Sequence, residues 1–215
     1  SMVNPKFGAE LYAELRRAMG VKEQVATNTE KLYNETMAEQ ANGKPTVYLD
    51  MDGVLADFFG GVEKLYGVSH WKQLASDKTK DLRQDVIERI TGTNFFETLP
   101  KFPTADPLIG MVKKFTGGKF SILTSPLRGD HDNSAKYKKI WINQNIEQPD
   151  ETIVTGRKEK YATTNGTPNI LVDDRPINIQ KWQDKGGYGI LYQANKDSIS
   201  TVEQSLKNYG AKNGN

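Results

Sequence analysis

The stretch TVYLDMDGVLADFFGG, from Thr46 to Gly61, decides the fold. It begins with an apolar run that is typical of a buried strand, and two aspartates, Asp50 and Asp52, follow directly, with Gly53 after them. Carboxylates resist burial unless a cation or a shared proton compensates their charge. We therefore expect a cation at the end of this strand.

The composition indicates a chain that folds around one core. Its 215 residues suit a single domain with a small insertion. The 29 Lys and Arg against 27 Asp and Glu give a formal charge of +2, which is no reason to expect strong binding to nucleic acid or to a membrane. The absence of cysteine excludes disulfides, thiolate zinc sites and cysteine nucleophiles. Since neither a membrane-spanning apolar run nor a signal-peptide pattern is present, we expect a cytoplasmic protein.

Strands and helices alternate along most of the sequence. This alternation predicts an α/β fold: a Rossmann-like parallel sheet of five strands with helices on both faces and right-handed crossovers. The strands are expected at 46–51, 119–124, 151–155, 169–173 and 188–193, and the helices between them at 105–115, 134–145 and 176–185.

Three parts are expected along the chain. A charged, helical N-terminal extension covers residues 1–44 and ends at a Gly and Pro break. The core domain consists of 45–56 and 106–215. The interval 57–105, inserted after the first strand, is expected to form a small, mostly helical cap, with a helix at 77–90.

Polar side chains stand where three of the predicted strands end. Because the carboxyl ends of parallel strands meet at one edge of a sheet, these side chains should lie close together. Mg²⁺ prefers a few carboxylate and carbonyl oxygens together with water and substrate phosphate. The sequence therefore predicts a site for Mg²⁺ and phosphate at this edge. The side chains are Asp50 and Asp52 after the first strand, Thr124 and Ser125 at the second, and Asp173 and Asp174 at the fourth.

Four ordered motifs resemble those of the haloacid dehalogenase (HAD) superfamily of phosphotransferases. Within it, LTSP followed by a Lys-Tyr segment and then VDDRP is most similar to the 5'(3')-deoxyribonucleotidases. The resemblance implies a Mg²⁺-dependent phosphomonoester hydrolase that forms an aspartyl-phosphate and acts on (deoxy)nucleoside monophosphates. The motifs are DMDGVL at 50–55, ILTS at 122–125, a lysine in TGRKEK at 155–160 and ILVDDRP at 170–176.

The resemblance also implies roles for individual residues. Asp50 would attack phosphorus, and Asp52 would protonate the leaving oxygen and then activate water. Lys158, with Lys160 as the alternative, would neutralise developing charge. Phosphate would be bound by Thr124, Ser125, Lys158 and the turn at Gly53, and the metal by Asp50, the carbonyl of Asp52, Asp173 and Asp174.

The cap supplies aromatic side chains that could stack on a base. Phe58, Phe59 and Trp71 are the expected substrate-binding residues, and stacking on one ring is worth about 1–3 kcal/mol per base. Packing in the interior of the cap is the alternative for each of them, as it is for Phe95 and Phe96. Lys136 could touch phosphate by analogy with the nucleotidases, but an exposed helix lysine is the simpler interpretation.

Other interpretations stay open at this point. Asp50 and Asp52 could cap a helix or bind calcium, and Asp173-Asp174 could cap the next helix. One alternative function is a 3'-end phosphatase for nucleic acids, which would need a basic groove. The other is a non-enzymatic phospho-acceptor or binding module, although Asp52 and the cap favour turnover. The expected partner is a small phosphate monoester, with a homodimer left open.

Overall fold

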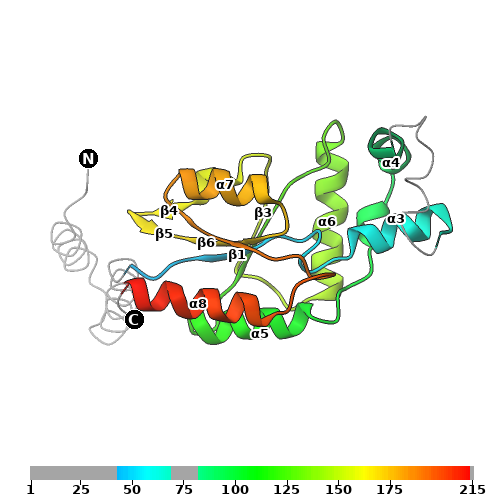
Figure 1. Ribbon diagram of the computed structural model, residues 1–215. Helices are drawn as coiled ribbons and strands as arrows, with labels where there is room; N and C mark the ends of the chain where they lie inside the picture. The colour runs from blue at the N-terminus through cyan, green and yellow to red at the C-terminus, as the bar shows by residue number, and fades with distance from the viewer. Residues whose placement is uncertain (1–42, 69–81, 214–215) are drawn as a thin grey trace, which may run out of the picture. The chain divides into compact units, whose positions relative to one another are not determined.

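The computed structural model describes residues 43–68 and 82–213 (Figure 1). The chain divides between Lys44 and Pro45 into two units, and the second of these contains every element named below. Residues 1–42 of the predicted extension, residues 77–81 of the predicted cap helix and Trp71 lie outside the described residues.

A parallel sheet of five strands lies at the centre, in the order β3-β2-β1-β6-β7. The predicted Rossmann-like α/β fold is therefore confirmed. All five predicted ranges are longer than the strands because they continue into the polar turns at the strand ends or include residues that precede the first ladder pair. The strands are β1 (Val47–Leu49), β2 (Ser121–Thr124), β3 (Glu151–Val154), β6 (Ile170–Asp173) and β7 (Tyr188–Leu191).

Helices cover both faces of the sheet, as predicted. Alternate residues of a strand point to opposite faces, and in β1 Val47 and Leu49 belong to one buried cluster while Tyr48 belongs to another with Trp182. The first cluster includes side chains of α5, α6 and α8, and the second includes those of α7; α5 and α8 lie below the sheet and α7 above it in Figure 1. The bounds are α5 (Ala105–Thr116), α6 (His131–Asn145), α7 (Pro176–Asp184) and α8 (Ser200–Asn213).

Two helices follow β1 and lie beyond its carboxyl end (Figure 1). The first, α3 (Phe58–Tyr66), begins where the Asp57 side chain accepts a hydrogen bond from the amide of Gly60 at 2.9 Å, a standard N-cap. The second helix is α4 (Leu82–Ile90). The hydroxyl of Tyr66, at the end of α3, donates a hydrogen bond to the side chain of Asp85 in α4. A 3₁₀ turn, η2 (Phe95–Thr98), then leads toward α5.

Some elements were not predicted. Between β3 and β6 the chain forms a 3₁₀ turn, η3 (Lys158–Tyr161), and an antiparallel hairpin of β4 (Thr163–Thr164) and β5 (Thr167–Pro168) around Asn165-Gly166. The C-terminal helix α8 was not predicted either, although Val202, Leu206 and Tyr209 of its sequence form a buried stripe at helical spacing. No helix in the described part of the chain is both long enough and apolar enough to cross a membrane.

The strand order locates the place where a ligand should bind. From β1 the chain continues to β2 on one side, whereas from β6 it continues to β7 on the other. In open α/β sheets ligands bind at such a reversal, outside the carboxyl ends of the strands. The carboxyl ends of β1 and β6 are therefore the first place to look for a site.

Candidate functional site

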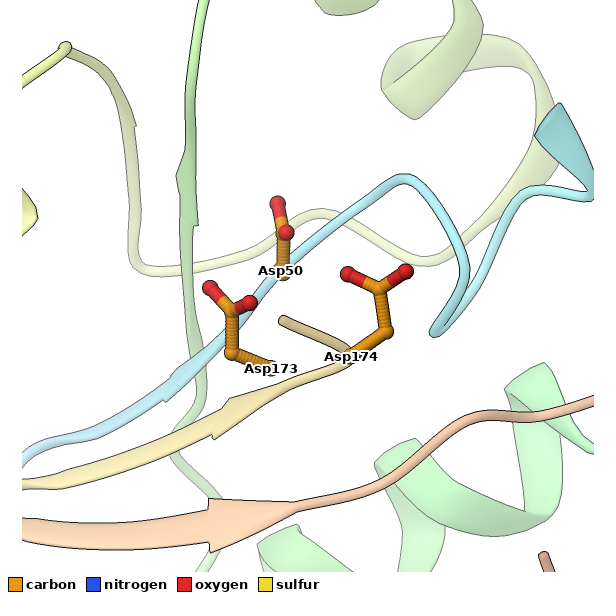
Figure 2. A group of neighbouring side chains, drawn as sticks. All are labelled: Asp50, Asp173 and Asp174. Carbon is orange, nitrogen blue, oxygen red and sulfur yellow. The ribbon is translucent and has the colours of Figure 1, made fainter. Parts of the chain in front are cut away.

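Three aspartates converge at the ends of β1 and β6. The amide of Asp50 donates a hydrogen bond to the carbonyl of Val172 at 2.9 Å, which places Asp50 beside Asp173. Figure 2 shows the carboxylates of Asp50, Asp173 and Asp174 on the same side of the two strands. One oxygen of each lies within 4.8 Å of the others, and Asp50 and Asp173 are 5% and 0% exposed. Parallel pairing thus gathers carboxylates from distant parts of the chain.

Lys158 compensates part of this negative charge. Its Nζ lies 2.9 Å from Oδ2 of Asp50 and 2.6 Å from Oδ2 of Asp173, and the residue is only 4% exposed. Burial alone would lower the pKa of Lys158, but the charges of Asp50 and Asp173 outweigh it and the pKa is raised. The lysine therefore stays charged. The alternative lysine, Lys160, is exposed.

Asp173 and Asp174 differ in what their oxygens contact. Oδ2 of Asp173 accepts a hydrogen bond from Lys158, and both of its oxygens are near Nδ2 of Asn178, at 3.0 and 3.1 Å. Oδ1 also accepts one from the amide of Arg175 at 2.9 Å. The described residues offer no hydrogen bond to the Asp174 carboxylate. Asp173 is thus held by the protein, whereas Asp174 is free to bind a ligand.

This donor set fits a hard divalent cation. Burial, followed by the charges of Asp50, Asp173 and Asp52, raises the pKa of Asp174 to about 8. Burial and three neighbouring carboxylates thus both oppose ionisation of Asp174, although Lys158 lies in the same cluster. A small divalent ion that takes oxygen ligands would supply compensating positive charge. Asp50, Asp173 and Asp174 are the carboxylates that could hold Mg²⁺, with the backbone carbonyl of Asp52 as a further oxygen.

Gly53 allows Asp174 to approach the turn after β1. Its φ is +76°, and a Cβ at this position would lie 2.3 Å from Oδ2 of Asp174. Its amide donates a hydrogen bond to the carbonyl of Ala56 at 2.8 Å, so in this conformation it is not available to phosphate. Gly53 thus makes room for Asp174, and its contact with phosphate stays a prediction.

Asp52 faces the other side of the turn and has two unlike oxygens. Oδ2 lies 2.5 Å from Nζ of Lys138. Oδ1 is buried and has no hydrogen-bond partner among the described residues. Burial raises the pKa of Asp52, and the positive charge of Lys138 opposes the rise. The side chain as a whole is 25% exposed, so this carboxyl group could take up or release a proton two residues after Asp50.

Thr124 and Ser125 end β2 next to these residues. Thr124 is fully buried, and its Oγ1 lies 3.2 Å from Nζ of Lys138. The carbonyl of Ser125 accepts a hydrogen bond from the same Nζ at 2.7 Å. The structure therefore brings both predicted phosphate-binding residues to the edge that carries Asp50. Lys136, which was considered for phosphate, is exposed and lies against Tyr137.

A pocket of about 680 Å³ opens over the carboxylates. Its far wall is apolar and comes from α3, α4 and the η2 turn, with Phe58 packed against Phe96 at 6.3 Å between ring centres. Phe59 also lines the pocket and is 46% exposed, whereas Phe95 is buried behind this wall. The predicted substrate-binding residues Phe58 and Phe59 thus face the predicted catalytic groups across one cavity. Trp71 lies outside the described residues.

Two residues of the site were missed from the sequence. Asn178 lies in the first turn of α7 and binds Asp173. Lys138 belongs to the buried stripe of α6 together with Ser134, Trp141 and Ile142. The helical spacing of 134, 138, 141 and 142 was the available signal, because it places one lysine among residues that point inward.

Comparison with known proteins finds structural likenesses among solved structures. The chain is similar to a solved structure of a hydrolase of the haloacid dehalogenase-like family from Streptococcus pneumoniae, with 14% sequence identity, 78% of this chain and 91% of that chain covered, and a TM-score of 0.42. No protein-family model matches the sequence, and no curated protein does. This likeness carries no information about activity, so the chemistry has to be inferred from the residues of the site.

Proposed function

We propose that this protein is a Mg²⁺-dependent phosphomonoester hydrolase of the HAD type that forms an aspartyl-phosphate on Asp50 and acts on (deoxy)nucleoside monophosphates. One observation carries the proposal. Lys158 bridges Asp50 and Asp173 at the sheet edge, while Asp52, two residues after Asp50, keeps one oxygen free of hydrogen bonds from the described residues. This is a nucleophile, a charge-compensating cation and a proton-transfer group in one place.

In the first step a carboxylate oxygen of Asp50 attacks phosphorus, and the bond between phosphorus and the leaving oxygen breaks. The leaving oxygen takes a proton from Asp52, so the alcohol departs neutral. Lys158 compensates the negative charge beside Asp50, and the hydroxyl of Thr124 donates to a phosphate oxygen. A bound Mg²⁺ would supply positive charge to the phosphate oxygens in this step.

In the second step water displaces Asp50 and releases inorganic phosphate. Asp52 has lost its proton in the first step, so it now accepts one from the attacking water. The two steps leave Asp50 as a free carboxylate and Asp52 protonated again, and the proton balance closes. The same residue thus serves as acid and then as base.

The apolar wall of the pocket supports a nucleotide as substrate. The phosphate is common to all phosphomonoesters, so selectivity has to come from contacts with the rest of the molecule. Phe58 and Phe59 offer ring faces and edges opposite the carboxylates, and base stacking on such rings tolerates any base. A nucleoside fits this pocket as the leaving group, because its base can stack on the rings while its phosphate lies at the carboxylates.

Two alternatives remain distinguishable. A nucleic-acid 3'-end phosphatase would need a cationic groove for the strand; Arg83, Arg128 and Arg175 line the pocket, but apart from Arg83 the wall from α3, α4 and η2 is apolar. A non-enzymatic phospho-acceptor would keep its phosphate, whereas the free oxygen of Asp52 favours hydrolysis. A panel of nucleotides, sugar phosphates and 3'-phosphorylated oligonucleotides, compared by kcat/KM, separates these possibilities.

The first test is metal-dependent hydrolysis of p-nitrophenyl phosphate. We expect activity with Mg²⁺ and none in EDTA, and we expect Asp50→Asn to lower kcat by about 10⁴-fold or more, because an amide cannot form the aspartyl-phosphate. Asp132→Asn is the matched control, since that side chain is fully exposed on α6. Full activity in EDTA, or an active Asp50→Asn variant with a native circular dichroism spectrum, would reject the proposal.

A further inference from the structure

Lys138 is a buried lysine for which the chemistry proposed above has no role. It reaches the site from α6, and its side chain is only 2% exposed. The other lysines of this helix, Lys136 and Lys139, are exposed. A lysine is rarely buried unless its charge is paired, so the contacts of this one need an explanation.

All three hydrogens of its ammonium group are used within the protein. Nζ lies 2.5 Å from Oδ2 of Asp52, 2.7 Å from the carbonyl oxygen of Ser125 and 3.2 Å from Oγ1 of Thr124. An ammonium group has three donors and no acceptor. The ring of Phe96 covers Nζ, with its centre at 4.6 Å. Lys138 therefore has no donor left for a substrate in this conformation.

These contacts make the two oxygens of Asp52 unequal. Lys138 binds Oδ2 and fixes the plane of the carboxyl group. Oδ1 is left buried and without a hydrogen-bond partner among the described residues. Lys138 thus fixes the orientation of the carboxyl group that exchanges protons in the proposed reaction.

The same ammonium group orients the hydroxyl of Thr124. Oγ1 accepts a hydrogen bond from Lys138, so one lone pair is used and the hydroxyl hydrogen points elsewhere. Thr124 stands at the end of β2, in the row of strand ends that carries Asp50, and in the proposed reaction this hydrogen would be donated to a phosphate oxygen. One cation therefore sets the direction of a phosphate donor and of the proton-transfer group together.

We propose that Lys138 is a positioning residue that holds the carboxyl group of Asp52 and the hydroxyl group of Thr124 in a fixed arrangement for the proposed reaction. This inference rests on the proposed phosphatase function. It assigns Lys138 no contact with the substrate and no proton of its own to transfer. Its effect on the reaction passes through Asp52 and Thr124.

The test compares two substrates in the variants Lys138→Met and Lys138→Arg, with Lys139→Met as the exposed control. An alkyl phosphate needs a proton on its leaving oxygen, whereas p-nitrophenyl phosphate does not, and kcat/KM covers the steps up to departure of that group. For Lys138→Met we expect kcat/KM to fall by about 10²-fold with the alkyl phosphate and by about 10-fold or less with p-nitrophenyl phosphate. Lys138→Arg should recover part of the alkyl phosphate activity.

A double variant guards against a simple folding defect. In the Asp52→Asn background, Lys138→Met should lower kcat/KM for the two substrates by the same factor, because the group it positions for proton transfer is gone. Melting temperatures are measured for all variants in parallel. Equal losses with both substrates in the single variant, or selective loss that persists in the Asp52→Asn background, would overturn the inference.

Failure of the inference and failure of the proposed function give different results. Active wild-type protein combined with a Lys138→Met variant of unchanged substrate ratio overturns the role of Lys138 alone. Wild-type protein that hydrolyses neither ester with Mg²⁺ overturns the proposed function and the inference together. If Lys138→Met does not fold, Lys138→Arg decides: a loss confined to the alkyl phosphate supports the inference, and equal losses with both substrates overturn it.

Discussion

The sheet edge at β1 and β6 and the helical wall made by α3 and α4 line the same pocket, but different forces hold their side chains. At the edge, each carboxylate follows a buried strand, and Lys158 links two of them through contacts of 2.9 and 2.6 Å. At the wall, aromatic rings contact one another edge to face, as Phe58 does with Phe95 at 5.6 Å. Charge and backbone geometry determine the edge, whereas apolar packing determines the wall.

This difference indicates how chemistry and selectivity are divided. A group that has to meet phosphorus needs a fixed position, and residues that follow paired strands have one. Apolar contacts are less directional and can accept different leaving groups. We therefore expect changes at the edge to lower the rate with every substrate, and changes at the wall to alter the preference among substrates.

After Asp50→Asn, the largest loss of activity is expected from substitution of Lys158 at the sheet edge. Lys158→Met leaves Asp50 and Asp173 without their shared cation, so we expect kcat to fall by about 10²–10³-fold for every substrate. In EDTA the free energy of unfolding should fall by ~3–5 kcal/mol, because a buried charge pair is broken. Urea unfolding and a nucleotide assay measure the two effects.

Lys160→Met is the control for this variant. Lys160 is exposed two residues along the same turn, and its loss should change stability by less than about 0.5 kcal/mol. Equal effects of the two substitutions would remove the distinction between the lysines and would contradict the assignment of Lys158.

A smaller, selective effect is expected from breaking the wall at Phe58. Phe58→Ala should raise KM for a nucleoside monophosphate by about 10- to 100-fold, which corresponds to one stacking contact of roughly 1–3 kcal/mol. The loss with p-nitrophenyl phosphate should be clearly smaller. Leu65→Ala is the control, because Leu65 lies on the same helix, is 42% exposed and is not among the residues that line the pocket. Equal losses with both substrates would show that Phe58 only packs within the wall.

The smallest expected effect is a pH dependence of stability, which tests the protonation of Asp174 at the sheet edge. The pKa of Asp174 is raised to about 8, against about 4 for an unfolded chain. The protonated form is favoured in the folded state, so its stabilising contribution is complete below pH 4 and is lost as the pH rises through 8. In EDTA, Asp174→Asn should therefore melt at the same temperature as wild type at pH 4 or below, and at a temperature several degrees higher than wild type near pH 9.

Added Mg²⁺ tests whether the ion competes with the proton for the carboxylate of Asp174. A protonated Asp174 has to release its proton to bind the ion, so Mg²⁺ should raise the melting temperature of the wild type more at pH 8.5 than at pH 6. In Asp174→Asn this increase should be largely absent. An Mg²⁺ response that is independent of pH would mean that Asp174 is not a ligand.

Much of the edge could be predicted because the relevant signals are local. Apolar runs of strand length that end in Asp50, Thr124 and Asp173 define both the sheet and the polar residues that follow it. Parallel pairing then brings these ends together, so the cluster follows from the fold class. Lys158 was placed by its position after β3, although only the structure distinguishes it from Lys160.

The contacts of Lys138 and Asn178 could not be predicted in the same way. Whether a helix residue faces a site depends on how the helix is rotated against the sheet, and sequence spacing gives that rotation only approximately. For Gly53 the local structure could be predicted, but its contacts could not. Its turn was expected, but the close approach of Asp174 and the hydrogen bond to Ala56 are tertiary contacts.

The pairing of β1 with β6 also determines when the site can come into existence during synthesis. The amide of Thr46 donates a hydrogen bond to the side chain of Asn169, a residue 123 positions later, and Asp50 meets Asp173 through the same ladder. A ribosome that has made the first motif must add the whole interval before its partner emerges. Contacts of such sequence separation form slowly, so ion binding should be among the last properties that the nascent chain acquires.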